Sequence, residues 1–193
     1  MEQIARKPTL VLMAGLPGAG KTTLAFALGE QLQWPVLSKD TLKTSLMMIE
    51  IVERVAGFAA YELLFAVAHD MLFRQSVSLI IDSAAHYPFI VHRASELARV
   101  ADAQLKVVHC VADHEVRRQR LSGRKTTIPL GNVTGPLAAF GETAGPGSVA
   151  QAVALSPSEE AELFSHLPPT RLVLPTNEAL GAYVGRAIAY LQE

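Results

Sequence analysis

The stretch GLPGAGKTT, residues 15–23, decides the fold of this chain. It follows an apolar run, TLVLMAG, and precedes a segment with leucine at positions 24, 28 and 32. The run predicts a buried strand, and the leucine spacing predicts one face of a helix. A glycine-rich turn between a strand and a helix is typical of loops whose backbone N–H groups wrap a phosphate.

The pattern G-x-x-x-x-G-K-[ST] is matched in full by Gly15, Gly20, Lys21 and Thr22. Glycine permits backbone angles that turn successive N–H groups inward, and the helix adds its positive dipole end. Lys21 supplies a charge for the β- and γ-phosphates, and the Thr22 hydroxyl can coordinate Mg²⁺. The alternative is a plain glycine turn with a solvated lysine. The expected nucleotide-binding residues are Gly15, Pro17, Gly18, Ala19, Gly20, Lys21, Thr22 and Thr23.

Outward from this motif, short apolar runs alternate with longer amphipathic segments. Strands are expected at residues 9–15, 34–38, 77–82, 104–112 and 171–175. Helices are expected from residue 21, through 41–55, and at 58–74, 89–101, 114–124, 156–167 and 177–191. The stripe expected to be buried on the 58–74 helix is Phe58, Tyr61, Phe65, Ala68 and Leu72. This alternation predicts an α/β fold with a five-stranded parallel sheet, helices on both faces and right-handed crossovers.

Bulk composition narrows the class of protein. A length of 193 residues suits a single domain, and a formal charge of −1 gives no attraction to nucleic acid, so a small ligand is the expected partner. The single cysteine, Cys110, lies in an apolar run and is expected to be buried and inert. No signal peptide and no apolar stretch of membrane-spanning length is visible, which favours a cytoplasmic protein.

Two aspartates follow predicted strands, where ligands of open α/β sheets collect. Asp40, in SKDTLK, could accept a proton from a hydroxyl that attacks the γ-phosphate, or it could simply cap the helix that starts at Thr41. Asp82, at the end of SLIID, could hold Mg²⁺ directly or through water, or it could be an ordinary turn residue. Spacing alone leaves both alternatives open.

The segment RRQRLSGRK predicts a basic helix. Arg120 and Arg124 lie four residues apart on one helical face and could clamp phosphate oxygens, whereas the role of Arg117 is less defined. A solvated basic helix or a nucleic-acid patch is the rival interpretation. Because the run leads into a glycine- and proline-rich stretch at 126–154, we expect residues 114–155 to form a lid with a mobile segment.

Four segments together resemble the small P-loop kinases. These are GLPGAGKT, LSKDTL, LIIDSAAH with Arg93 following, and EVRRQRLSGR. The most similar branch is the AAA_33 type, which includes polynucleotide 5′-kinase, chloramphenicol phosphotransferase and zeta-toxin-like kinases. The resemblance spans residues 9–125. It implies a parallel five-stranded sheet, MgATP as donor, and transfer of the γ-phosphoryl group to a hydroxyl or a phosphate.

The same resemblance assigns roles residue by residue. Lys21 and Thr22 resemble the nucleotide ligands, and Asp40 resembles the residue that activates the acceptor. Arg120 and Arg124 resemble lid arginines. Arg93 lies where the branch often has a substrate-facing arginine. His86 and His92 could line the acceptor pocket, although a structural or solvent-facing place suits them better. The resemblance is also the only reason to expect ATP rather than GTP.

The chain departs from these relatives after Lys125. Residues 126–155 carry a single charge, Glu142. A neutral hydroxylated small molecule is therefore the expected acceptor, and the expected activity is an ATP-dependent phosphotransferase. A nucleotide-binding switch or simple NTPase is the main alternative. A nucleic-acid 5′-kinase is less favoured, because neither this segment nor the net charge supplies a basic channel.

Overall fold

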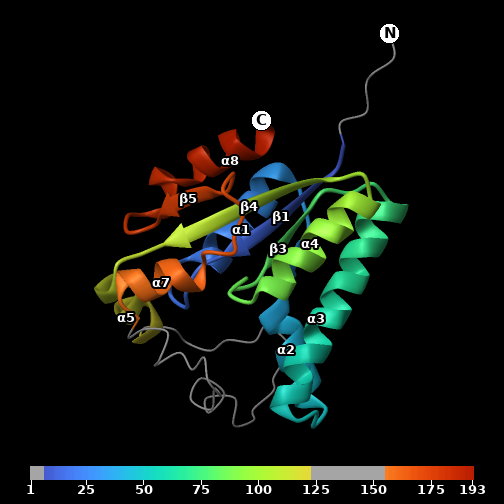
Figure 1. The fold of residues 1–193 in the computed structure, drawn as a ribbon, viewed down its shortest axis with the longest axis horizontal. Coiled ribbons are helices and arrows are strands. Elements are labelled where there is room, and N and C mark those ends of the chain that lie inside the picture. The colour runs from blue at the N-terminus through green and yellow to red at the C-terminus, as the bar shows by residue number, and fades with distance from the viewer. Residues whose placement is uncertain (1–6, 123–154) are drawn as a thin grey trace.

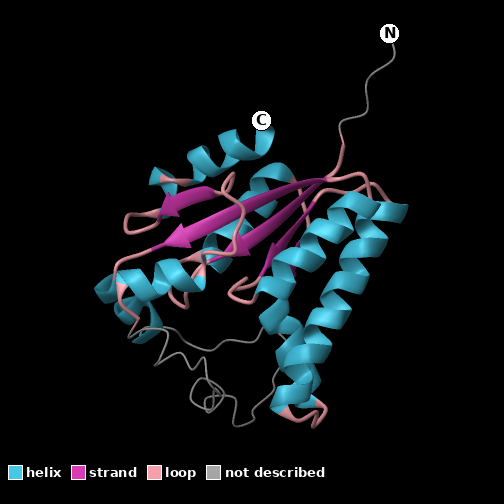
Figure 2. Cartoon of the chain, viewed as in Figure 1, coloured by secondary structure: helices cyan, strands magenta, loops and turns pink. Residues whose placement is uncertain are grey.

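The core of the molecule is one twisted sheet (Figures 1 and 2). The structure, a computed structural model, describes residues 7–122 and 155–193. All strands run parallel in the order β2-β3-β1-β4-β5. They are β1 (Thr9–Ala14), β2 (Val36–Ser38), β3 (Leu79–Asp82), β4 (Gln104–Val111) and β5 (Leu172–Pro175). The predicted five-stranded parallel sheet is confirmed.

Helices cover both faces of the sheet, as predicted (Figure 1). Alternate β1 side chains point to opposite faces: Leu10 and Leu12 pack with α3 and α4, and Val11 packs with α1 and α8. The helices are α1 (Lys21–Leu32), α2 (Lys39–Met48), α3 (Glu53–His69), α4 (Pro88–Val100), α5 (His114–Ser122), α7 (Pro157–Leu163) and α8 (Val184–Gln192). A capping box starts α7, with Ser156 and Glu159 bonding reciprocally.

The sheet register brings the candidate residues to one edge. Ser38 at the end of β2 lies level with Asp82 at the end of β3, and β3 pairs with β1, which leads into the glycine-rich loop. Because the strands are parallel, their carboxyl ends meet at this edge. The loop, the start of α2 and Asp82 therefore surround the same space.

Three helix boundaries differ from the sequence prediction. Residues 41–55 do not form one helix, because the chain breaks at 49–52, where Glu50 has a φ of 66°. α3 consequently begins at Glu53, and Ala56, Ala60 and Leu64 continue its buried face. Phe58 lies off that face and is 65% exposed, so the prediction that it is buried is wrong. The last helix begins at Val184, after a short 3₁₀ turn at Leu180–Ala182, rather than at residue 177.

The helix that starts at Glu53 is longer than the helix at 58–74 that the sequence predicts. α3 continues through a π-helical turn, Asp70–Arg74, so that Glu53–Arg74 forms 22 residues of helix. Its length and apolar composition are those of a helix that can cross a membrane, and equally those of a core helix. Leu64 and Phe65 pack in the core. The predicted lid continues beyond α5 into 123–154, which lies outside the described residues.

Candidate active site

The glycine-rich loop has a shape that only glycine allows at two positions. Gly15 has a φ of 133°, and a Cβ there would lie 2.3 Å from the carbonyl oxygen of Cys110. Gly18 has a φ of 80°, and its Cβ would lie 2.8 Å from the carbonyl oxygen of Arg117. Gly20 is the N-cap of α1 and has no side chain to bond the first-turn N–H groups. The start of α1 thus remains a place for an anion.

Lys21 and Thr22 occupy the first turn of α1, as the motif requires. The Lys21 ammonium donates a hydrogen bond to the carbonyl oxygen of Leu16 at 2.9 Å, so its side chain folds back along the loop. The Thr22 hydroxyl is next to it in the chain, and Asp82 ends β3 with only 6% of its surface exposed. A hydroxyl and a carboxylate are hard oxygen ligands, which suits Mg²⁺ held together with nucleotide phosphates. Among residues 7–122 and 155–193, no cluster of three or more His, Cys, Asp or Glu forms a separate metal site.

The back of the loop is held by two distant parts of the chain. Arg120, on α5, donates from its guanidinium to the carbonyl oxygens of Gly18, at 3.3 Å, and of Thr176. Thr176 follows β5, and its hydroxyl donates a hydrogen bond to the carbonyl oxygen of Ala19 at 2.8 Å. Arg117 is 2% exposed and donates to the carbonyl oxygen of Ala112 at 3.1 Å. Arg120 thus lies beside the phosphate loop, whereas Arg124 lies outside the described residues.

Asp40 is not the cap of its helix. Ser38 is the N-cap of α2, and its hydroxyl accepts from the Thr41 N–H at 3.4 Å. The capping interpretation of Asp40 is therefore wrong, because the residue already sits inside the first turn. Its carboxylate is 78% exposed and lies 3.3 Å from the Lys39 ammonium. This carboxylate is available to a ligand at the sheet edge.

A group of ionisable and aromatic side chains extends the site beyond Asp40. Burial, aided by the charges of Lys39, Lys21 and His166, lowers the pKa of His86 to about 4, so its imidazole is neutral at physiological pH. The Lys39 ammonium lies 5.6 Å from the centroid of the Tyr61 ring. Burial raises the pKa of the Tyr61 hydroxyl, and the Asp40 charge raises it further. His86 is partly buried near these charges, and its place in an acceptor pocket stays a prediction.

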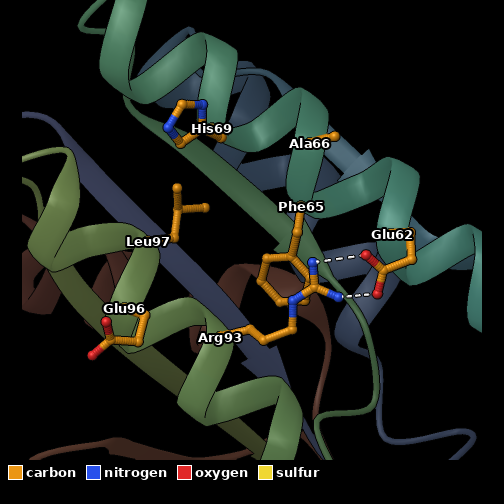
Figure 3. Close-up of a pocket in the computed structure, with 7 residues that line it drawn as sticks. All are labelled: Glu62, Phe65, Ala66, His69, Arg93, Glu96 and Leu97. Carbon is orange, nitrogen blue, oxygen red and sulfur yellow. Dashed lines mark hydrogen bonds and ion pairs between the residues drawn. The ribbon is translucent and has the colours of Figure 1, made fainter.

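Arg93 takes a different place (Figure 3). Its guanidinium pairs with both oxygens of Glu62 and lies 4.7 Å from the centroid of the Phe65 ring. It lines a groove of about 340 Å³ between α3 and α4, together with Glu62, Phe65, Ala66, His69, Glu96 and Leu97. In this structure Arg93 therefore contacts α3, and its role toward a substrate stays a prediction. Cys110 is buried as expected, and burial raises the pKa of its thiol to about 12.

Comparison with known proteins identifies the family. The family model AAA_33, described as an AAA domain, matches residues 10–139, which is more than half of the chain. The chain belongs to the AAA_33 family. No curated protein matches its sequence.

Solved structures give this AAA_33 protein the fold of P-loop kinases. A "putative kinase" of Chloroflexus aurantiacus is 25% identical, covers 97% of this chain and 98% of its own, and superposes with a TM-score of 0.64. The APS kinase of Mycobacterium tuberculosis is 16% identical, with 97% and 99% coverage and a TM-score of 0.63. The shikimate kinase of Bacteroides thetaiotaomicron is 18% identical, with 96% and 99% coverage and a TM-score of 0.60.

Sequence reasoning missed three residues of this AAA_33 site. Lys39 stands directly before Asp40 in SKDTLK, and a cation next to a candidate base is a signal that the sequence offers. Tyr61 was expected only as a core residue, yet the centroid of its ring lies 5.6 Å from the Lys39 ammonium. Thr176 gave no local signal, because its partner Ala19 lies 157 residues away.

Proposed function

We propose that this protein is an ATP-dependent phosphotransferase that moves the γ-phosphoryl group of MgATP to a hydroxyl of a small molecule. The observation that carries the proposal is the placement of Asp40. Ser38 supplies the helix cap, so the Asp40 carboxylate is exposed at the same sheet edge as the phosphate loop. A protein that only bound a nucleotide would need no such carboxylate there.

The proposed transfer forms one bond, breaks one bond and moves one proton. The acceptor hydroxyl oxygen attacks the γ-phosphorus in line, and the bond to the oxygen that bridges the β- and γ-phosphorus breaks. ADP leaves with the electron pair of that bond, and the hydroxyl proton passes to the Asp40 carboxylate. Mg²⁺, when bound by Thr22 and Asp82, neutralises phosphate charge. The protein otherwise contributes orientation, which is most of what phosphoryl transfer requires.

The remaining residues support the donor half of this reaction. Lys21, at the start of α1, provides the charge for the β- and γ-phosphates. Arg120 bonds the loop carbonyl of Gly18, which supports the loop that would hold the phosphates. We assign Arg124 a similar role from its spacing to Arg120. His86 is neutral and can exchange a hydrogen bond with the acceptor.

The comparisons agree with a kinase. The APS kinase structure holds AMPPNP and APS together, so a protein with this fold can seat a nucleotide and an acceptor at once. At 16% identity this likeness supports only the fold. The proposed activity rests on the position of the Asp40 carboxylate at the sheet edge. ATP is favoured over GTP because of the family resemblance.

A transfer screen tests the proposal. The protein is incubated with radiolabelled MgATP and pools of hydroxylated metabolites and antibiotics, and labelled products are separated from phosphate. The blank is Lys21→Ala, which removes the charge that holds the β- and γ-phosphates. A labelled organic product that is absent from the blank supports the proposal. Release of inorganic phosphate with every pool, and no organic product, would instead identify a simple NTPase.

A further inference from the structure

The acceptor side of the site contains a second ammonium besides that of Lys21. Lys39 is the first residue of α2, and its side chain is only 18% exposed. Lysines are rarely covered to this extent unless a partner compensates the charge. Its position directly after β2 places it at the carboxyl edge of the sheet, beside Asp40.

The compensation that Lys39 receives is small. In the described part of the chain its one hydrogen-bond acceptor is an Asp40 oxygen at 3.3 Å. That carboxylate is 78% exposed, so water screens the pair. An ammonium has three N–H donors, and the ring of Tyr61 offers only a weaker electrostatic contact. Lys39 therefore has capacity for a further anion.

Lys39 faces the same space as the phosphate loop. Lys39 begins α2 directly after β2, and Lys21 begins α1 directly after the glycine-rich loop, so both helices start at the carboxyl edge of the sheet. The charges of both lysines also lower the pKa of His86, which follows β3. Lys21 belongs to the nucleotide motif, whereas Lys39 is adjacent to the proposed base. An anion bound by Lys39 would thus lie one side chain away from the hydroxyl that Asp40 activates.

We propose that Lys39 binds a carboxylate or phosphate group carried by the acceptor, so that the protein selects anionic hydroxylated small molecules over neutral ones. This inference rests on the proposed function, because it places the acceptor next to Asp40. The sequence predicted a neutral acceptor because residues 126–155 carry a single charge. That prediction did not consider the residues at the sheet edge.

The buried Tyr61 ring beside Lys39 strengthens this attraction, and further rings adjoin it. Tyr61 is 7% exposed and meets Phe89 edge-on, with ring centroids 5.5 Å apart. Phe89 stacks with Tyr87 at 5.8 Å, and Tyr87 contacts His86 at 4.0 Å. A charge pair beside such rings is screened less than one in open water. An anionic acceptor therefore gains more here than at an exposed lysine.

Binding to matched compounds tests the assignment without requiring turnover. Glycerol is compared with glycerate and with glycerol 3-phosphate, and glucitol with gluconate, so that the compared compounds differ chiefly in one anionic group. Dissociation constants are measured by saturation-transfer NMR with Mg²⁺ and AMPPNP present. We expect the anionic compounds to bind about tenfold or more tightly than their neutral partners. The carboxylate and phosphate arms show which anion is preferred.

Three variants sharpen the measurement. Lys39→Met should remove the preference, and Lys39→Arg should keep most of it. Lys43→Met is the matched control, because Lys43 lies on the same helix and its ammonium bonds Glu53 at 2.5 Å. Equal binding of neutral and anionic compounds to the parent would overturn the proposal. Equal binding of the anionic compounds to the parent and to Lys39→Met would also overturn it, and so would a failure of every compound to bind.

Turnover separates this proposal from two others. If Lys39 only oriented Asp40, Lys39→Met would lower kcat with every acceptor and leave acceptor KM unchanged. If Lys39 bound the γ-phosphate, the variant would raise the KM for ATP. Our proposal expects a higher KM for the anionic acceptor alone. Anion preference without any phosphoryl transfer would refute the proposed function but keep the anion site.

Discussion

The proposed donor and acceptor sides of the site are built in different ways. On the donor side the backbone makes the site: Gly15 and Gly18 approach other main-chain atoms too closely for any side chain, and Thr176 bonds the loop from behind. On the acceptor side α2 has no buried residue, and the Asp40 carboxylate is largely exposed. One side depends on backbone shape and the other on side-chain chemistry.

This difference determines what each side tolerates. A loop defined by close backbone contacts has one arrangement, so substitutions there should affect folding and nucleotide binding together. Side chains on a half-exposed helix can change without disturbing the core, so substitutions there should alter turnover or acceptor choice alone. The predictions below test whether the two sides separate in this way.

The largest effect is expected from Gly15→Ala. The new Cβ would meet the carbonyl oxygen of Cys110 in β4, at a φ that disfavours alanine. The free energy of unfolding should fall by about 3 kcal/mol or more, measured by chemical denaturation. Gly57→Ala is the control, because nothing lies within 4 Å of its Cβ on α3, and it should stabilise slightly. Equal stability of Gly15→Ala and the parent would refute the close approach.

Asp40→Asn should affect turnover alone. Loss of the carboxylate removes the proposed acceptor of the hydroxyl proton, so kcat should fall by about 100-fold or more while the Kd for MgATP is unchanged. Stability should also be unchanged, because Ser38 caps α2. Asp102→Asn is the control, since Asp102 is exposed and pairs with Lys7. Loss of ATP binding in Asp40→Asn would show that the two sides are not separate.

Arg120→Met tests the junction of α5 with the loop. Its guanidinium bonds Gly18 and the Thr176 carbonyl, so its loss should loosen the loop and raise the Kd for MgATP about tenfold. Titration calorimetry measures this change. Arg118→Met is the control, because Arg118 is exposed and pairs with Glu115. The same Kd for MgATP in both variants would show that Arg120 does not contribute to nucleotide binding.

The smallest effect concerns pH. Burial lowers the pKa of both His86 and His109 to about 4. Between pH 6.5 and 4 the unfolded chain binds protons that the native imidazoles do not, so stability should decline as the pH falls through this range. His86→Gln should flatten the decline, as followed by thermal unfolding from pH 7 to 4. A steeper decline in His86→Gln would contradict the assignment. The exposed His92→Gln serves as the comparison.

Local patterns predicted the donor side well and the acceptor side less well. The glycine motif and the apolar runs carry their structure within a few residues, so the loop and all five strands were found. Ser38 and Asp40 are both residue types that cap helices well, and they lie two residues apart. Which of them is the cap depends on where α2 begins, and it begins at Lys39. The break at Glu50 needs a positive φ, which its residue type does not indicate. Phe58 is apolar and fits the helical spacing, and only the packing of α3 shows that it lies outside the buried face.

The Thr176 hydroxyl has a consequence for synthesis of the protein. It bonds the carbonyl of Ala19 from the far end of the chain, and β5 follows every other strand in sequence. A chain emerging from the ribosome therefore exposes the phosphate motif long before the residue that braces it. The nascent polypeptide therefore lacks this bond to the nucleotide loop until residue 176 has been translated.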